Sequence, residues 1–297
     1  MTQRKLALVT IIGKPNAGKS TLLNHLIGQK IAIVTPKVQT TRSSVTGIVS
    51  TGDTQLVFID TPGIFRAKTS FEKAMVRCAW SNIVGADSVI FLVDSKKGFD
   101  DESVEILDKL KQHNIKPIIA INKIDDRNSK KDSIMKQLSN LEQDFTIFPI
   151  SALRGDNIDE LIKFITDNAK EKEWLYDEDA LTNLPERFIA SEITREQLFL
   201  QMQQELPYKL TVESESWEIL KDGSVKISQV IIVSRQNYKA MILGNKGERI
   251  KNIGTKAREE IAKALDIKPH LFLFVKVRED WDTNPLNYKY LGLKWKK

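Results

Sequence analysis

The chain has 297 residues, of which 41% are hydrophobic and 28% charged, and its formal net charge is +6. This composition excludes a wholly disordered chain, and the length indicates two domains. The longest apolar runs have the length of strands, so no membrane-spanning helix is predicted. A single cysteine, Cys78, excludes an internal disulfide, and together with the absence of a recognisable secretory signal it indicates a cytoplasmic protein.

The region from Leu6 to about Ala169 alternates short apolar runs with amphipathic stretches, which predicts an α/β domain. Strands are expected at 6–12, 44–50, 55–59, 89–93, 117–121 and 146–150, and helices are expected to begin near 19, 71, 101, 133 and 157. Gly52-Asp53 predicts an antiparallel hairpin in an otherwise parallel sheet. Asp156 is the expected cap of the last of these helices.

The order of the expected elements changes after residue 170. We predict a first domain at 1–170, a linker at 171–190 and a second domain with a C-terminal tail at 191–297. The second domain reads as a helix at 191–205, strands at 210–220 and 225–234, two helices around residues 244–247, and a strand at 270–277. This order predicts a small α+β domain.

The positive charge is concentrated in the second half of the chain. Residues 185–297 hold 20 basic residues against 15 acidic ones, and the stretch from Arg235 to Arg258 holds seven basic residues against the single acid Glu248. Such a stretch favours a polyanionic partner. A solvated helix face explains it equally well on charge alone.

Residues 13–20 read Gly-Lys-Pro-Asn-Ala-Gly-Lys-Ser, between a predicted strand and a predicted helix. This pattern in this context predicts a loop that binds nucleotide phosphates. Gly13 and Gly18 let backbone N–H groups approach phosphate oxygens, Lys19 supplies positive charge, and the Ser20 hydroxyl can coordinate Mg²⁺. The predicted phosphate-binding residues are Gly13, Asn16, Ala17, Gly18, Lys19, Ser20 and Thr21.

Three further segments follow predicted strands. Asp60-Thr61-Pro62-Gly63 places Asp60 where it can reach Mg²⁺ through water and Gly63 where it can meet a γ-phosphate. The second segment spans residues 122–125. Its Asp125 can accept two hydrogen bonds from guanine and would repel the acceptor of adenine, which disfavours an ATPase. The predicted guanine-binding residues are Asn122, Lys123, Asp125, Ser151 and Ala152, the last two through their backbone N–H groups.

These motifs, with Gln39-Thr40-Thr41-Arg42, resemble the Ras-like G domain of the Era family of bacterial GTPases. The resemblance implies that Thr41 contacts Mg²⁺ and the γ-phosphate, with Thr40 as the alternative. Ile64 stands where many Ras-like enzymes carry a water-orienting glutamine, so slow intrinsic hydrolysis is implied and the catalytic side chain is left unidentified. Asn16 resembles an asparagine of relatives that bind K⁺, and capping of the loop explains it equally well.

Gly244-Asn245-Lys246-Gly247 lies between two predicted helices. In this order of elements it resembles the loop of a prokaryotic (type II) KH domain, which members of the Era family carry after the G domain. Such a loop grips a nucleic-acid backbone. The implied RNA-binding residues are Gly244, Asn245, Lys246, Gly247, Arg249, Lys251 and Arg258, with Ile242 and Ile250 on the apolar side of the groove.

The resemblance also implies the cofactors and the partner. The cofactors are GTP, GDP and Mg²⁺. The partner is small-subunit (16S) ribosomal RNA near its 3′ end, bound during assembly of the 30S subunit. Peripheral contact of the protein with the membrane is also implied. We expect a monomer. A nucleotide-gated RNA adaptor or chaperone with negligible turnover shares every motif and is the alternative. The aromatic residues Trp281, Tyr288, Tyr290 and Trp295 are interpreted as a tail packed on its own domain rather than as platforms for bases.

Overall fold

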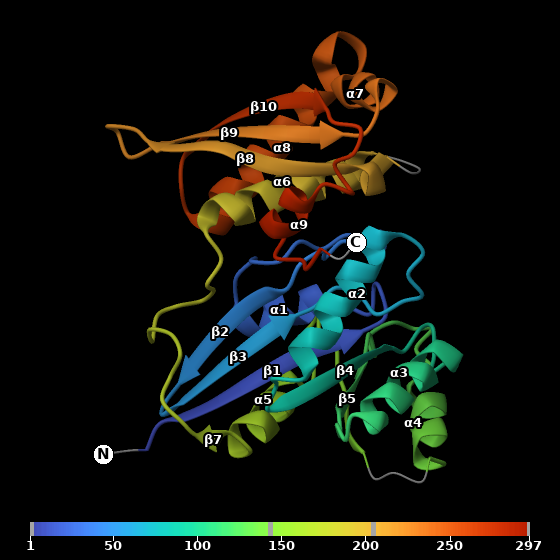
Figure 1. The fold of residues 1–297 in the computed structure, drawn as a ribbon. Helices are drawn as coiled ribbons and strands as arrows, with labels where there is room; N and C mark the ends of the chain where they lie inside the picture. Colours follow the sequence, from blue (N-terminus) through green and yellow to red (C-terminus); the bar gives the residue numbers. More distant parts are fainter. Residues whose placement is uncertain (1–2, 142–144, 203–205, 296–297) are drawn as a thin grey trace. The chain divides into compact units, whose positions relative to one another are not determined.

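The computed structural model describes residues 3–141, 145–202 and 206–295. The chain forms two compact units, shown as a ribbon in Figure 1. The first unit contains the residues up to Gln29 together with Thr41–Asn183, and the second contains Lys30–Thr40 and Leu184–Trp295. Among the described residues, every helix is too short or too polar to cross a bilayer.

The first unit is built on a sheet with the strand order β2-β3-β1-β4-β5-β6. The strands are β1 Lys5–Gly13, β2 Val45–Thr51, β3 Thr54–Asp60, β4 Ser88–Asp94, β5 Ile118–Asn122 and β6 Thr146–Pro149. All pairs along this path are parallel except β2 and β3, which form the predicted antiparallel hairpin around Gly52-Asp53. The predicted α/β class is thus confirmed, and the parallel strands direct their carboxyl ends to one edge.

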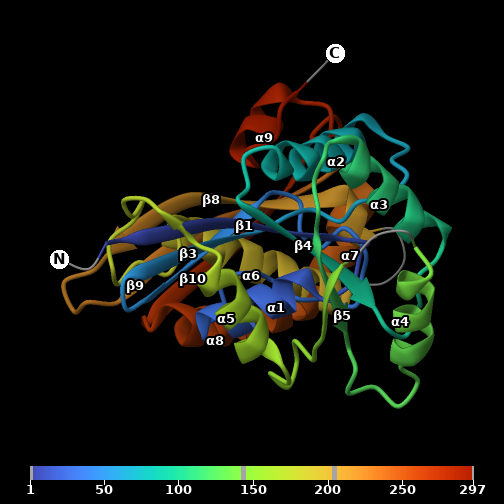
Figure 2. The same ribbon diagram turned by 90° about the horizontal axis from the view of Figure 1, so that it is seen from below.

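Helices cover both faces of this sheet: α1 Lys19–Ile27, α2 Ser70–Ile83, α3 Asp101–Gln112, α4 Lys131–Ser139 and α5 Ile158–Asp167. Figure 2 shows α2 and α3 on one face and α1 and α5 on the other. The apolar sides of α2, α3 and α4 form one buried cluster with β4 and β5. Burial of these side chains is the main force that holds the helices on the sheet.

Residues next to the N-termini of α2 and α5 determine where these two helices begin. Thr69 precedes α2, and its side chain accepts a hydrogen bond from the N–H of Glu72 at 3.2 Å, while the Glu72 carboxylate accepts the N–H of Thr69 at 3.0 Å.

The expected cap of α5 by Asp156 is wrong. Asn157 occupies the cap position with φ 57° and makes no side-chain capping bond, because Asn tolerates the left-handed conformation needed there.

The residues after α5 stay with the first unit. A short strand, β7 Lys170–Glu171, pairs antiparallel with β1. Trp174 then donates from Nε1 to the carbonyl of Asp53 at 3.2 Å, and the N–H of Ile48 donates to the carbonyl of Leu181 at 2.9 Å. Much of the segment between 171 and 183 is therefore hydrogen-bonded to the hairpin of β2 and β3.

The second unit follows the predicted α+β order. It contains α6 Glu186–Gln201, β8 Leu210–Ile219, β9 Val225–Val233, α7 Gln236–Leu243, α8 Glu248–Leu265, β10 Pro269–Val277 and α9 Pro285–Tyr290, with short 3₁₀ turns at Leu206–Lys209 and Asn245–Gly247. The sheet order is β10-β9-β8, with β8 antiparallel and β10 parallel to β9. Residues 203–205 of the expected first helix lie outside the described residues.

The tail after β10 packs on the second unit, as expected for Trp281 and Tyr288. Trp281 is fully buried and Tyr288 nearly so. Trp281 donates from Nε1 to the carbonyl of Lys209 at 3.2 Å, and the Tyr288 hydroxyl donates to the carbonyl of Asp282 at 3.0 Å. Trp295 remains 37% exposed, and the side chain of Tyr290 is outside the described part. The two buried aromatic rings are core residues and are not available for stacking.

Candidate nucleotide and RNA sites

The phosphate loop joins β1 to α1, where Gly18 is the N-cap of the helix with φ 103°. A Cβ placed on Gly18 would lie 2.2 Å from Nδ2 of Asn122, so only glycine fits at this position. The first N–H groups of α1 have no partners within the helix. This arrangement suits an anionic group. Thr21 lies in the first turn of the same helix.

Lys19 is buried at the start of α1. Its Nζ donates to the backbone carbonyls of Gly13 at 3.3 Å and Lys14 at 3.2 Å. Burial lowers the pKa of Lys19, and the nearby Asp60 carboxylate opposes this shift. Neutral carbonyls compensate a buried ammonium only in part, so a phosphate would be a stronger partner.

Ser20, Thr41 and Asp60 converge, although they are far apart in the sequence. Ser20 Oγ donates to Asp60 Oδ2 at 2.6 Å and lies 2.9 Å from Thr41 Oγ1, which is 3.4 Å from the same carboxylate oxygen. Asp60 is buried, which raises its pKa to about 6, and its Oδ1 has no partner among the described residues. Two hydroxyls and a carboxylate with an unsatisfied oxygen form a donor set that fits Mg²⁺.

Thr40 has a different environment from Thr41. Its hydroxyl lies 2.6 Å from Oγ1 of Thr35 and 2.7 Å from the carbonyl of Lys37. Its own carbonyl accepts a hydrogen bond from Nη2 of the buried Arg195 at 2.6 Å. These contacts lie within the second unit, so the geometry favours Thr41 over Thr40 as the threonine near the metal.

Gly63 and Ile64 pass close to the phosphate loop. A Cβ on Gly63 would lie 2.9 Å from the backbone nitrogen of Pro15, and the N–H of Ile64 donates to the carbonyl of Gly13 at 3.0 Å. The Ile64 side chain is only 6% exposed and belongs to the apolar cluster under α2 and α3. An aliphatic side chain cannot orient or deprotonate water, so Ile64 supplies no general base.

The predicted base-recognition residues lie against the phosphate loop. Asn122 donates from Nδ2 to the carbonyl of Ala17 at 2.8 Å and accepts the N–H of Ala152 at 2.9 Å. Lys123 donates from Nζ to the carbonyl of Asn16 at 2.6 Å. The Asp125 Oδ1 accepts the Ser151 hydroxyl at 2.7 Å, which orients the carboxylate. The structure thus brings these segments together at one edge of the sheet.

The loop at 244–247 is a tight turn that continues into α8. Gly244 has φ 71°, and a Cβ there would lie 2.6 Å from Cβ of Arg249, so the close approach requires glycine. Arg249 donates from Nη1 to the carbonyl of Met241 at 2.7 Å. A cavity of about 480 Å³ lies beside this loop, lined by Gln201, Gly244, Asn245, Glu248, Arg249, Asn252 and Lys256. We call it the loop groove.

Several predicted residues lie outside the loop groove. The expectation for Ile242 is wrong, because its side chain is fully buried in the core, and Ile250 packs against the same core. Lys251 is exposed and does not line the groove. Arg258 lines a separate hollow beside β10, together with Lys268.

Comparisons with known proteins decide the family. A family model described as a 50S ribosome-binding GTPase matches residues 8–123, and a KH domain model matches residues 205–282. The GTPase Era of Rickettsia conorii is 56% identical over 99% of this chain and 86% of its own length. The chain belongs to the Era family of GTPases. The Era protein of Brucella suis is 45% identical over 98% of this chain and 94% of its own length.

Solved Era structures share the whole fold. An Era variant from Aquifex aeolicus bound to GDP·AlF₄⁻ matches with a TM-score of 0.89 and 38% identity, covering 97% of this chain and 99% of that one. Era in complex with MgGDPNP and nucleotides 1506–1542 of 16S ribosomal RNA matches with the same score, identity and coverage. The resemblance inferred from the motifs, including the GTPase activity and the pairing of a G domain with a KH domain, is therefore confirmed.

Sequence reasoning missed residues of both sites in this Era family member. Asp94 ends β4 and pairs with Nζ of Lys123 at 2.7 Å, which holds that lysine against the phosphate loop. A carboxylate at the carboxyl end of a predicted strand was the available signal. Asn252 and Lys256 line the loop groove, and their spacing of three and seven residues from Arg249 places all three on one side of α8.

Proposed function

We propose that this GTPase binds the 3′ region of small-subunit (16S) ribosomal RNA through its KH domain and acts in assembly of the 30S subunit. The observation that carries this proposal is the loop groove, where Arg249 and Lys256 of α8 line a cavity beside the loop, and where a Cβ on Gly247 would meet only open space. The Era relative solved with nucleotides 1506–1542 of 16S RNA supports the choice of RNA.

We further propose that the nucleotide is held as Mg·GTP. Ser20 and Thr41 would ligate Mg²⁺, with Asp60 acting through water, and the metal would neutralise phosphate charge. Lys19 would pair with the β- and γ-phosphates, and Asp125 would recognise guanine. The convergence of the three oxygen donors, which leaves one Asp60 oxygen unsatisfied, supports this assignment.

Other expectations stay predictions. Asn16 adopts φ 65° in the phosphate loop, and its proposed role at K⁺ is tested by comparing GTP hydrolysis in potassium and sodium chloride at equal ionic strength. Peripheral membrane contact, a cytoplasmic location and a monomeric state are likewise proposals. Multiple-turnover phosphate release, with and without the RNA, measures the rate of GTP hydrolysis and whether the RNA increases it.

The RNA proposal is tested on the full chain with a labelled RNA that corresponds to nucleotides 1506–1542 and with a non-hydrolysable GTP analogue present. The double variant Asn245→Asp/Lys246→Asp adds repulsion and removes a basic contact, so its affinity should fall at least about tenfold, and the slope of log affinity against log salt should flatten by roughly 0.7.

Ser216→Asp/Lys221→Asp is the matched control. It changes the net charge by the same amount at exposed positions on β8 and the turn after it. RNA affinity should stay within about twofold of the parent in this control. Equal loss in both double variants would show a general charge effect and would refute the loop groove as the RNA site.

A further inference from the structure

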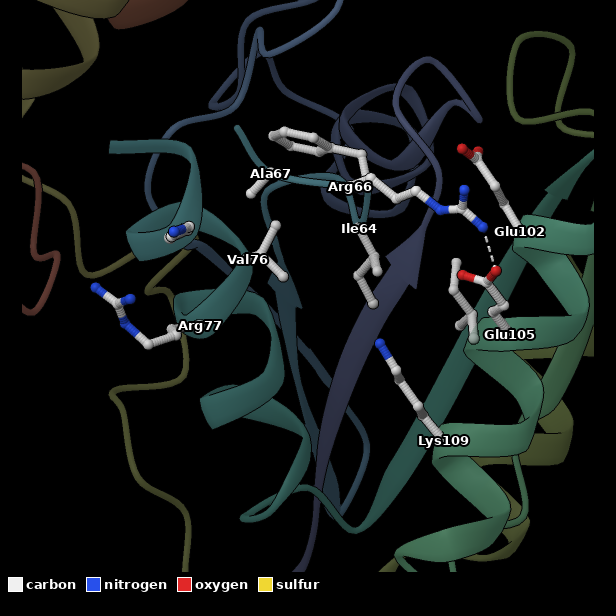
Figure 3. Close-up of a pocket in the computed structure, with 11 residues that line it drawn as sticks. Ile64, Arg66, Ala67, Val76, Arg77, Glu102, Glu105 and Lys109 are labelled. Atoms are coloured by element: carbon white, nitrogen blue, oxygen red, sulfur yellow. Dashed lines mark hydrogen bonds and ion pairs between the residues drawn. The ribbon is translucent and has the colours of Figure 1, made fainter. Parts of the chain in front are cut away.

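A second cavity lies in the first unit between α2 and α3, beside the segment that follows Gly63. Its volume is about 370 Å³, and Ile64, Val76 and Ile106 form its apolar walls. Figure 3 shows Ile64 and Val76 directed into it. This volume is at the lower end of the range for ligand pockets, so it suits one anchoring group rather than a large cofactor. We call it the α2/α3 pocket.

The exposed side chain of Lys109 borders this apolar space. Figure 3 shows Lys109 extending from α3 into the pocket, with its ammonium directed towards Ile64. Its Nζ lies 5.9 Å from the centre of the Trp80 ring. Within the described part of the chain, Lys109 forms no ion pair. A bound group with a carboxylate fits this position, because its charge complements the ammonium.

The rim of the pocket carries excess positive charge. Its acidic residues, Glu105 and Glu102, are already paired: Glu105 with Arg66, and Glu102 with Lys14 at 2.9 Å. Lys73, which is exposed on α2, adds a further cation to the rim. The surface that a ligand meets is therefore apolar inside and cationic at the edge.

We propose that the α2/α3 pocket is the docking site of a partner protein, which inserts one large apolar side chain and places a neighbouring carboxylate against Lys109. An apolar anchor in a small pocket, surrounded by an accessible charged rim, is the usual arrangement of a protein–protein hot spot. The pocket wall begins at Ile64, directly after Gly63. If the bound nucleotide moves that wall, the affinity for the partner and the affinity for the nucleotide depend on each other.

The test uses the full-length protein loaded with GDP and labelled with ¹³C at the isoleucine δ1 methyl groups. The probe is the peptide Ac-EEWEE-NH₂, and the neutral Ac-QQWQQ-NH₂ is its matched control. Titration with the acidic peptide should shift the methyl resonances of Ile64 and Ile106, with a dissociation constant of about 1 mM or below, and should leave the core residue Ile48 unchanged. The neutral peptide should bind at least about fivefold more weakly.

Two lysine variants of α3 complete the design. Lys109→Gln should weaken binding of the acidic peptide by about fivefold, whereas Lys111→Gln, which is exposed on the same helix outside the pocket, should not change it. The proposal fails if Ile64 and Ile106 do not shift, if the two peptides bind equally, or if both lysine variants behave alike. It also fails if N-acetyltryptophan binds as tightly as the peptide, because the ligand would then be a small molecule.

Discussion

Asn122 links the base-recognition segments to the phosphate loop through one side-chain amide. Its Nδ2 donates to the carbonyl of Ala17 and its Oδ1 accepts the N–H of Ala152, and all three residues are buried. One amide thus fixes the relative positions of segments that come from three distant parts of the chain. Its loss should affect nucleotide binding even without a direct contact to the nucleotide.

Asn122→Ala should destabilise the protein and weaken nucleotide binding together. The change leaves a buried carbonyl and a buried N–H without partners, at a cost of about 1–3 kcal/mol each. Urea unfolding and titration with a fluorescent GDP analogue measure the two effects. Asn128→Ala, an exposed position on the following loop, is the control and should change neither. An Asn122→Ala protein with parental affinity would show that this bridge does not organise the site.

Asp125→Asn should exchange guanine for xanthine specificity. The amide places a donor where guanine also donates, so GTP affinity should fall by several kcal/mol, while xanthosine triphosphate, which presents an acceptor there, should bind better. Competition binding with GTP, XTP and ATP measures this directly. Equal binding of GTP and ATP by the unchanged protein would refute the assignment of Asp125.

Asp60 predicts a specific pH dependence of stability. Burial raises its pKa to about 6 from the ordinary 3.8, so the folded protein holds this proton more tightly than the unfolded chain. The folded state without nucleotide therefore loses stability as pH rises from about 4 to 6 and changes no further above 6. Asp60→Asn removes this penalty and should stabilise the nucleotide-free protein by up to about 3 kcal/mol at pH 7.5, and by roughly half as much at pH 5.

Urea unfolding at the two pH values, with nucleotide removed, checks this expectation. The same variant should lose the Mg²⁺ dependence of nucleotide binding, because a neutral amide attracts the metal less than a carboxylate does. In the unchanged protein, Mg²⁺-dependent binding should weaken below about pH 6 as protons compete for the carboxylate. A variant that is destabilised equally at both pH values would contradict the role of burial.

Two basic residues of α8 should differ in their effect on RNA binding. Lys256 lines the loop groove, whereas Arg258 lines the separate hollow beside β10. Lys256→Glu should therefore reduce both RNA affinity and its salt dependence, with a change of roughly 0.7 in the slope for one lost contact. Arg258→Glu, with the same charge change two residues away, should have the smaller effect. The reverse order would place the RNA on the other side of α8.

The sequence predicted best what depends on neighbouring residues. The phosphate loop, the segment at 122–125 and the succession of strands along the chain were all predictable, because each depends on a local sequence pattern. The pairing of Asp94 with Lys123 was not, since it depends on the adjacency of β4 and β5 in the sheet. Such long-range contacts can be predicted only when the order of the strands within the sheet is known.

The RNA-binding set shows a different kind of error. Ile253, Ala257 and Ile261 form the buried stripe of α8 at intervals of four residues. Arg249, Asn252 and Lys256 lie along one side of that stripe, while Lys251 and Arg258 lie along the other. Counting charges along the sequence combined the two sides into one basic stretch. The helical period, taken together with the stripe, would have separated them.

Trp281 lies after the last β-strand and is still part of the core of the second unit. A messenger RNA with a stop codon before position 281 would still encode the complete G domain and every residue of the loop groove, yet its product would leave the space filled by Trp281 and Tyr288 open. Such a product exposes apolar core to chaperones and proteases and should be scarce in cells. The tail after β10 is therefore needed for the abundance of the folded protein, because Trp281 and Tyr288 complete the core of the second unit.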